Sequence, residues 1–528
     1  MPDRPSVEQL VHETFPGLRP DASAGGDLLR YRPDQAQLPG LVRLLHQTLH
    51  CRLALLFAVA HSAGSETYDI QYLFAQESRQ PWILLTLELT GQERLFPSIT
   101  PSVHAAQWYE REIRDLFGLI PHGHPDLRRL IRHEHWPKGA HPLKKDFAWD
   151  AVMGRQQGEY RFRRIDGEGV FEIPVGPIHA GIIEPGHFRF SVAGEPILQL
   201  EVRHFWKHRG GEKLFEQQRL TAAVPLAERI SGDTTVGHGL AYCQAVETLM
   251  QLTAPRRARY LRSFFLELER LHNHLGDVGA ICNDTAYALP HAHCSRMKER
   301  VMQLNDRLAG SRFLRGVLCV GGVAQDVERT LLADTVDEVS RIEQDFSELE
   351  AIIAANASLT DRLETTGVLT ERIAWDHGVV GVVGRASGLD QDVRRDRPFA
   401  AYDELPVNVA CYRYGDVRAR VRVRMDEIHE SIRLIREICR TIPDGPLTAA
   451  PNHSPRAGEW AISAVEGWRG EILSFVMAGE DGGIHRCKVR DPSFANWPAI
   501  QWAVVGNIIP DFPLINKSFN LSYAGNDL

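Results

Sequence analysis

A helical repeat of apolar residues that follows Pro255 constrains the fold more than any other feature of the chain. Its positions lie three or four residues apart and so share one face of a helix: Leu261, Phe264, Leu268, Leu271, Leu275 and Val278. Proline is favoured in the first turn of a helix, so we expect this helix to begin at Pro255. Three more long helices are predicted, at residues 290–313, 326–357 and 417–441. The chain beyond about residue 212 should therefore be mostly helical.

The amino-terminal part has the pattern of strands instead. Residues 51–60 form an apolar run, residues 68–74 alternate between apolar and other positions, and Trp82–Leu89 has the composition of a third strand. A helix over Gln107–Leu116 should follow and end at Gly118. These elements predict a small antiparallel sheet accompanied by a helix.

The length of the chain requires more than one domain. Its 528 residues exceed what one ordinary hydrophobic core supports. Residues 151–172 are polar and contain glycine, as a linker would, and residues 187–205 resemble strands interrupted by a turn at 193–196. We therefore predict an α+β protein. A small sheet-containing domain at 1–150 precedes the linker, and a large, mostly helical domain at 173–528 opens with strands.

Composition excludes several classes of protein. The formal net charge is −8, and the sequence lacks the basic stripe that would indicate a nucleic-acid partner. The longest clearly apolar stretches, such as Leu53–Ala60, reach only eight residues, whereas a membrane helix needs about 20. The amino terminus lacks the apolar core of a signal peptide. The eight cysteines form no CxxC pair, and no Gly-x-Gly-x-x-Gly follows a strand. We expect a cytoplasmic chain with reduced thiols and no nicotinamide site of its own.

Two sets of motifs carry a resemblance to known proteins. Tyr109–Phe147 combines a Glu-Arg-Glu helix, a glycine stop, a His-Pro-Asp-Leu turn and a late Pro-Leu-basic-Lys-Asp, and it resembles the C-type, or 30-kDa-type, subunit of respiratory complex I. The second part resembles the D-type, quinone-side subunit of complex I and the large subunit of nickel–iron hydrogenases in four stretches: Gly176–His179, His208–Leu214, Glu267–His274 and Asp392–Asp403. The fused arrangement is most similar to large subunits of formate-hydrogenlyase-type hydrogenases.

The resemblance implies a site for nickel and iron, which the sequence does not supply. Hydrogenases of this family hold the two metals through two CxxC pairs. The first pair of positions is occupied here by Ser231 and Thr234, and the second by Ser493 and Asn496. Hydroxyls and an amide are hard, weak donors, whereas such a centre needs soft thiolates. We therefore expect no metal on this chain and no nickel–iron hydrogenase activity.

The quinone-binding residues of complex I are also replaced. In that family a His and a Tyr hydrogen-bond the quinone head group, and Ile183 and Gly232 stand at the matching positions. Leu314 stands where a further His lies beside the terminal cluster of the neighbouring subunit. A quinone could still bind in an altered cavity, but these residues give no direct support for it.

What the resemblance leaves is an acid–base and electrostatic frame. It implies that Glu184 matches the first proton relay of the hydrogenases and that Arg469 matches the arginine above their metal centre. Asp284 matches an acid that links the complex I cavity to the membrane arm. Asp277 lies two turns earlier, about 10 Å away on the same helix face. His179 is retained in the loop that contains Glu184.

Arg209 and His238 complete the candidate set, as residues near the partner's cluster or the cavity. Buried carboxylates near arginine can have shifted pKa values and relay protons. Simpler roles stay open, because Asp277 and Asp284 would also suit a solvated or ion-paired helix face. Glu184 could act only in a turn and Arg469 only in a structural ion pair, and the histidines between residues 122 and 141 fit packing better than metal binding.

Two functions follow from the resemblance. In the first, the chain is a water-soluble core subunit of a membrane-bound oxidoreductase similar to NADH–quinone oxidoreductase or the hydrogenases. It would join a small subunit carrying a 4Fe-4S cluster, lie on the inner face of the cell membrane, and couple electron transfer to ion movement in membrane subunits, with no cofactor of its own. In the second, it is a non-catalytic coupling or scaffold subunit with a vestigial redox cavity. In both, the chain acts within a complex and not alone.

Overall fold

The computed structural model describes residues 6–21, 28–76, 81–91 and 93–528. The chain divides into two compact units, which are described separately. The first contains the described residues up to Phe162 together with Arg203–Lys213 and Trp375–Gly378. The second contains Arg163–Val202, Leu214–Ala374 and Val379–Leu528. Strands and helices occur in both units, which confirms the α+β class.

A four-stranded sheet organises the first unit. The three predicted strands are β2 (Arg52–Ala60), β3 (Tyr68–Ala75) and β4 (Trp82–Leu89), which pair antiparallel. A strand that the sequence did not indicate, β1 (Leu28–Tyr31), adds to β4 in parallel, so the sheet is mixed and not wholly antiparallel. A parallel edge needs a crossover, and the chain between β1 and β2 supplies it through α2 (Leu38–Arg43).

The predicted helix of the first unit is α3 (Gln107–Phe117), and it ends at Gly118 as expected. Gly118 has φ 77° and ψ 14°, a left-handed conformation that glycine adopts without steric cost. The remaining elements of this part are α1 (Val7–Thr14), a π-helical turn at Leu44–Thr48, β5 (Leu95–Pro97), a short 3-10 turn at His104–Ala106 and β6 (Ile120–His122). Residues 151–166 contain no helix or strand.

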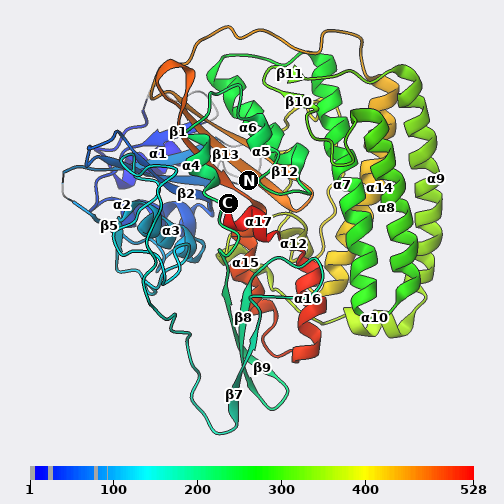
Figure 1. The fold of residues 1–528 in the computed structure, drawn as a ribbon, viewed down its shortest axis with the longest axis horizontal. Coiled ribbons are helices and arrows are strands. Elements are labelled where there is room, and N and C mark those ends of the chain that lie inside the picture. The colour runs from blue at the N-terminus through cyan, green and yellow to red at the C-terminus, as the bar shows by residue number, and fades with distance from the viewer. Residues whose placement is uncertain (1–5, 22–27, 77–80, 92) are drawn as a thin grey trace. The chain divides into compact units, whose positions relative to one another are not determined.

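Long helices dominate the second unit, as their apolar periodicity predicts. The helix after Pro255 is α7 (Arg256–Asp284), and the other three predicted helices are α8 (Ala288–Ala309), α9 (Arg329–Ala354) and α14 (Val417–Thr441). Helix α7 packs against α8 and α14, and α9 packs against the same two helices, so the four lie side by side (Figure 1). The apolar stripe of α7 is fully buried in this bundle.

Two three-stranded antiparallel sheets also belong to the second unit. The first contains β7 (Val170–Val175), β8 (His187–Ala193) and β9 (Ile197–Arg203), of which β8 and β9 are the strands predicted over 187–205. The second contains β12 (Trp460–Gly467), β13 (Gly470–Ala478) and β14 (Ile484–Arg490). Helix α6 (Thr235–Leu249) packs on β12 and β13, which fixes its amino terminus beside the turn that joins these two strands.

Shorter elements connect these parts. They are α4 (Gly211–Phe215), α5 (Val224–Ala227), β10 (Leu318–Cys319), β11 (Gly322–Val323), α10 (Ala357–Leu363), α11 (Glu371–Asp376), α12 (Gly381–Ala386), α13 (Val393–Asp396), a 3-10 turn at Glu480–Gly482, α15 (Pro492–Ala503), a 3-10 turn at Ile509–Asp511, α16 (Phe512–Phe519) and α17 (Tyr523–Asp527). Figure 1 shows the carboxy-terminal helices α15, α16 and α17 grouped together. Among the described residues no helix is both long enough and apolar enough to cross a membrane.

Candidate functional site

The first pair of cysteine-equivalent residues lies at the amino terminus of α6. The Ser231 hydroxyl donates to Asp233 Oδ1 at 2.9 Å, and the Thr234 hydroxyl donates to the same oxygen at 3.0 Å. Thr234 is the N-cap residue of α6, so its position follows from where the helix begins. The two hydroxyls that replace the thiolates therefore converge on one carboxylate, which the sequence places between them.

The second pair lies in the first turns of α15. The Asp491 side chain caps this helix by accepting from the Ser493 amide at 2.7 Å. The Ser493 hydroxyl in turn accepts from the Ser522 amide at 2.9 Å. Asn496 is turned to the backbone of Val380, which it contacts through both its oxygen and its nitrogen at 3.0 and 3.1 Å. The hydroxyl of Ser493 thus faces the carboxy-terminal segment.

Ser522 joins the two pairs. Its hydroxyl lies 3.0 Å from that of Ser231, and its amide donates to Ser493. Ser522 therefore bridges Ser231 and Ser493, which are 262 positions apart in the sequence. We name the group formed by Ser231, Asp233, Thr234, Arg469, Ser493 and Ser522 the polar site.

Arg469 closes the polar site with an ion pair. Its Nη1 and Nη2 atoms donate to the two oxygens of Asp233 at 2.7 and 2.8 Å, and its guanidinium lies 3.9 Å from the centre of the Trp468 ring. Burial alone would raise the pKa of Asp233, but Arg469 and the neighbouring hydroxyls outweigh it and hold that pKa below its usual range. Asp233 is therefore a stable anion paired with a buried cation.

This donor set does not fit a nickel–iron centre. The hydroxyls of Ser231 and Thr234 are already hydrogen-bonded to Asp233, and the Asn496 amide is paired with the backbone. The Thr234 hydroxyl also accepts from the Arg469 guanidinium at 3.3 Å and from the Trp468 indole at 3.1 Å, so it is occupied by groups of this chain. Among the described residues no group of three or more His, Cys, Asp and Glu side chains is placed to hold a metal ion.

Asn520 connects the polar site to Asp277, the candidate residue two helical turns before Asp284 on α7. Arg469 Nε donates to the backbone carbonyl of Asn520 at 2.6 Å, and the side-chain Nδ2 of Asn520 donates to Asp277 Oδ1 at 2.6 Å. The other oxygen of Asp277 accepts from Arg424 Nε at 2.8 Å. Asn520 ends α16 with φ 45° and ψ 52°, the left-handed conformation that asparagine tolerates better than most residues.

Asp284 stands apart from this hydrogen-bonded series. It is the last residue of α7, it is exposed, and it makes no hydrogen bond within the part of the chain that the structure describes. Partial desolvation raises its pKa, while Lys517 and His291 oppose the rise. The structure thus places Asp277 and Asp284 on one helix, as expected, but gives them different surroundings.

Glu184 and His179 lie in the loop between β7 and β8. Glu184 Oε2 accepts from the amide of Ala524 at 3.0 Å, which puts this carboxylate two residues from Ser522. His179 contacts the Gly186 carbonyl through Nε2 at 2.7 Å and so ties the ends of the loop together. Ile183, at the position of the quinone-binding histidine, is 39% exposed and contributes no polar group.

His238 reaches the polar site through Asp491. Its Nε2 atom lies 2.9 Å from Asp491 Oδ2, and both side chains are 1% exposed. Burial would raise the pKa of Asp491, but His238 and Arg469 hold it below its ordinary value. Arg209 belongs to the first compact unit, where it is exposed, and the structure does not relate it to these residues.

Glu269 is a buried acid at the site that sequence reasoning missed. Its carboxylate accepts from the amides of Val236 and Gly237, in the first turn of α6, at 2.6 and 3.0 Å. Burial raises its pKa to about 8 despite these two donors, and the charge of Asp233 adds to the rise. Asp233, Ser522, Asn520 and Glu269 were all missed. Asp233 alone had a sequence signal, as a charged residue between two cysteine-equivalent positions.

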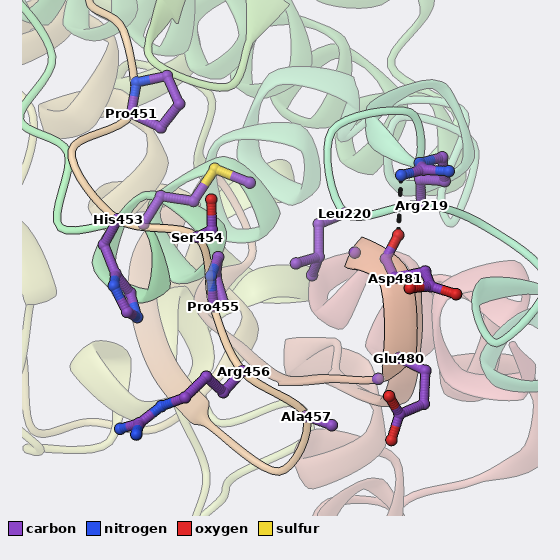
Figure 2. Close-up of a pocket in the computed structure, with 13 residues that line it drawn as sticks. Arg219, Leu220, Pro451, His453, Ser454, Pro455, Arg456, Ala457, Glu480 and Asp481 are labelled. Carbon is purple, nitrogen blue, oxygen red and sulfur yellow. Dashed lines mark hydrogen bonds between the residues drawn. The ribbon is translucent and has the colours of Figure 1, made fainter.

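An open hollow of about 730 Å³ lies elsewhere in the second unit and shares no lining residue with the polar site (Figure 2). Its basic side chains already have partners in the chain. Arg219 donates to the Asp481 carbonyl at 2.8 Å, and Glu459 pairs with both His453 and Arg456 at 2.8 Å. The side chains in Figure 2 do not converge on a common point, so this hollow is not the candidate site.

Comparison with known proteins found one family model for the amino-terminal part of the chain and another for the carboxy-terminal part. The family model "Respiratory-chain NADH dehydrogenase, 30 Kd subunit" matches residues 32–152. The model "Respiratory-chain NADH dehydrogenase, 49 Kd subunit" matches residues 284–460 and 449–527. The chain is 34% identical to hydrogenase-4 component G of Escherichia coli over 93% of its own length and 86% of that protein.

The chain belongs to the family of fused 30 kDa and 49 kDa complex I-type subunits. Two further members of this family extend the comparison. Formate hydrogenlyase subunit 5 of E. coli is 32% identical over 98% of the chain and 92% of that protein. The fused C/D subunit of NADH-quinone oxidoreductase from Methylococcus capsulatus is 27% identical over 88% of the chain and 86% of that protein. The relatives are thus core subunits of complex I-type and hydrogenase-type complexes.

Proposed function

We propose that the chain is a core subunit of a membrane-associated oxidoreductase complex and that it is not a nickel–iron hydrogenase. It would pair with a small subunit that carries a 4Fe-4S cluster and with membrane subunits that move ions, at the inner face of the cell membrane. The names of its fused relatives, which include NADH-quinone oxidoreductase and formate hydrogenlyase subunits, support this assignment.

The observation that carries the proposal is the Asp233–Arg469 ion pair. It fills the place where the family's cysteine pairs would converge, and it does so with side chains of this chain. A metal that binds through thiolates would find hydroxyls and an amide there. The polar site instead contains the charges of Asp233 and Arg469. An electron or proton that arrives nearby would interact with these charges.

A series of hydrogen bonds connects the polar site with the long helices, and it could couple a change of charge at the site to those helices. It runs from Asp233 through Arg469 and Asn520 to Asp277 and Arg424, on α7 and α14. We infer that a change of charge at the polar site alters the Asp277–Arg424 pair through this series. Glu184, next to Ser522, would hold or release a proton at the same place, and a quinone would have to bind without the usual head-group partners.

A scaffold role is the second candidate, and the closure of the polar site favours it. Every hydroxyl that replaces a thiolate is satisfied within the chain, chiefly by Asp233 and Ser522. Such a site could persist for packing alone, with no redox step in the cavity. The chain would then keep the subunit architecture of its family and transmit movements between its partners.

Purification of the intact complex through a tag on this chain tests the proposal. We expect the complex to contain iron and acid-labile sulfide from the partner, to lack nickel, and to evolve no hydrogen from a reduced viologen dye. About one nickel per chain that survives chelator treatment would contradict the non-hydrogenase assignment. If the partner shows an iron–sulfur signal that Asp233→Asn alters, the redox role is supported; if no iron–sulfur partner co-purifies, the scaffold role is correct.

A further inference from the structure

A second group of charged side chains is buried between α7, α12, α13, α14 and β12. Each member is at most 2% exposed: Glu267, Arg270, His274, Arg385, Asp392, Arg394, Glu427 and Glu466. We name this group the core charge cluster. It lies where α7 and α14 run side by side (Figure 1). None of the roles assigned so far uses it.

Two arginines organise the part of the cluster around Glu427. Arg385 donates to Glu427 Oε1 at 2.6 Å and to Glu466 Oε1 at 2.8 Å. Arg270 lies 3.3 Å from Glu427 Oε2, and His274 contacts the same oxygen through Nε2 at 2.8 Å. Glu427 therefore faces three nitrogen groups. Glu466 shares one guanidinium with it.

A third arginine organises the remainder. Arg394 pairs with Asp392 at 2.7 Å and with Glu267 at 3.1 Å. Glu267 also lies 3.3 Å from Arg270 and accepts from the hydroxyl of Tyr402 at 2.5 Å. These two carboxylates are held as anions by direct contacts. Their pKa values are accordingly lowered, because the arginine charges outweigh the effect of burial.

The charges of the cluster do not balance without a proton. Four carboxylates face three guanidinium groups, so a neutral His274 leaves one uncompensated negative charge. An uncompensated charge in a dry interior costs several kcal/mol. The adjacent ion pairs, Arg424–Asp277 and Arg469–Asp233, are each neutral and supply no positive charge. One additional proton makes the cluster neutral.

Contacts indicate which group holds that proton. Glu466 has fewer charged donors than the other three carboxylates, since within the described part of the chain its side chain contacts only Arg385 and the Val393 amide, at 2.8 and 3.1 Å. Burial and the charge of Asp392 raise the pKa of Glu466 to about 7. Burial lowers the pKa of His274, so the imidazole stays neutral. The charged side chains that act on these two groups are Arg270, Arg385, Asp392, Arg424 and Glu427.

We propose that Glu466 is an internal proton-binding site of this protein, neutral at rest, which gives up or takes a proton as the charge around it changes. The turn from Glu466 to Arg469 connects it with the polar site. Arg270 donates to the Glu466 carbonyl at 2.6 Å, and the Trp468 indole donates to the Thr234 hydroxyl at 3.1 Å. The Trp468 ring also lies 6.0 Å from that of His274.

A buried nitrogen of His274 offers a second position for the proton. His274 Nδ1 is buried and has no hydrogen-bond partner among the described residues, while Nε2 is occupied by Glu427. A proton leaving Glu466 can thus be accepted at Nδ1, which forms an imidazolium beside Glu427 and leaves the total charge of the cluster unchanged. The use of this site in coupling rests on the proposed function, whereas the existence of the site does not.

Infrared spectroscopy of the purified full chain in light and heavy water tests the proposal. The carbonyl stretch of a protonated carboxyl group is distinct from that of a carboxylate and shifts on deuteration. We expect wild type to show a buried acid band at neutral pH that is absent from Glu466→Gln. Glu269→Gln is the matched control, because it removes another buried acid and should leave the Glu466 band in place.

A second variant tests the charge balance and also decides the matter if Glu466→Gln does not fold. Asp392→Asn removes one negative charge, after which an ionised Glu466 leaves the cluster neutral. We therefore expect the Glu466 band to be lost at neutral pH and to return only in more acidic solution. Identical acid bands in wild type and Glu466→Gln, or an unchanged band in Asp392→Asn, would overturn the proposal. Neither outcome depends on electron transfer, so the test is separate from that of the proposed function.

Discussion

Arg469 and Asp233 form a two-point ion pair, with Nη1–Oδ1 at 2.7 Å and Nη2–Oδ2 at 2.8 Å, at the place where the relatives' cysteine positions converge. The pair explains how the family scaffold can keep its shape without thiolates. A buried arginine there needs an anion, and Asp233 is the residue that supplies it.

Asp233→Asn should destabilise the second unit by about 1–2 kcal/mol, because it leaves the buried Arg469 without a counter-charge while solvent partly screens Asp233, whose side chain is 37% exposed. The midpoint of urea unfolding, followed by tryptophan fluorescence, measures the loss. The double variant Asp233→Asn with Arg469→Gln should recover part of it. If the loss in the double variant equals the sum of the losses in Asp233→Asn alone and Arg469→Gln alone, the two charges do not interact.

Substitutions of Asn520 separate its side chain from its backbone conformation. Asn520→Gly keeps the left-handed conformation and loses the contact with Asp277, at a cost of about 1–2 kcal/mol. Asn520→Ala loses the same contact and adds about 1 kcal/mol of backbone strain. Thermal unfolding should therefore rank wild type above Gly and Gly above Ala. Ala at least as stable as Gly would contradict the strain at this position.

Glu110, in α3, should make the first unit less stable as pH rises. It is fully buried and accepts from Ser98, Thr100 and the Ile99 amide, and burial raises its pKa to about 7 from an ordinary value of 4.5. The folded state thus favours the protonated form. Its contribution is complete below pH 4.5 and is lost as pH rises to about 7. Urea midpoints across this range should fall in wild type and fall less in Glu110→Gln.

Limited proteolysis of the isolated chain should cut first between residues 151 and 172. Residues 151–166 have no regular structure and are mostly exposed, and the division between the compact units falls after Phe162. We expect two fragments, identified by mass spectrometry, that correspond to the proposed 1–150 and 173–528 domains. First cleavage within residues 255–285 would instead show α7 to be less stable than the linker.

Asp284→Asn should leave assembly unchanged and abolish ion movement in the intact complex. The residue is exposed at the end of α7 and makes no hydrogen bond within the described chain, so its loss should change the free energy of unfolding by less than about 0.5 kcal/mol. Ion uptake into membrane vesicles measures the coupling, with Asp284→Glu as the control that retains a proton. Wild-type uptake by the Asn variant would refute a relay role for Asp284.

Periodicity was sufficient to predict the four long helices of the second unit and the strands β2, β3 and β4, but not the sheet of β12, β13 and β14. The apolar steps of α7, the alternation of β3 and the glycine after α3 are local patterns, and the structure confirms the element that each predicted. The parallel strand β1 was not predicted, because four residues carry too short a pattern and its place depends on pairing with β4. Such predictions use only the type of each residue and of its neighbours in the sequence.

The sequence by itself determined the long helices, the strands β2, β3, β4, β8 and β9, and the loss of all four thiolates, since each of these is a property of residue type and local spacing. Only the tertiary structure decided that Asp233 pairs with Arg469, that Ser522 joins Ser231 to Ser493, and that Asn520 connects Arg469 to Asp277. These contacts link residues up to 291 positions apart. A hydrogen bond needs atoms within about 3 Å, and no periodic signal in the sequence encodes a distance between segments that only folding brings together.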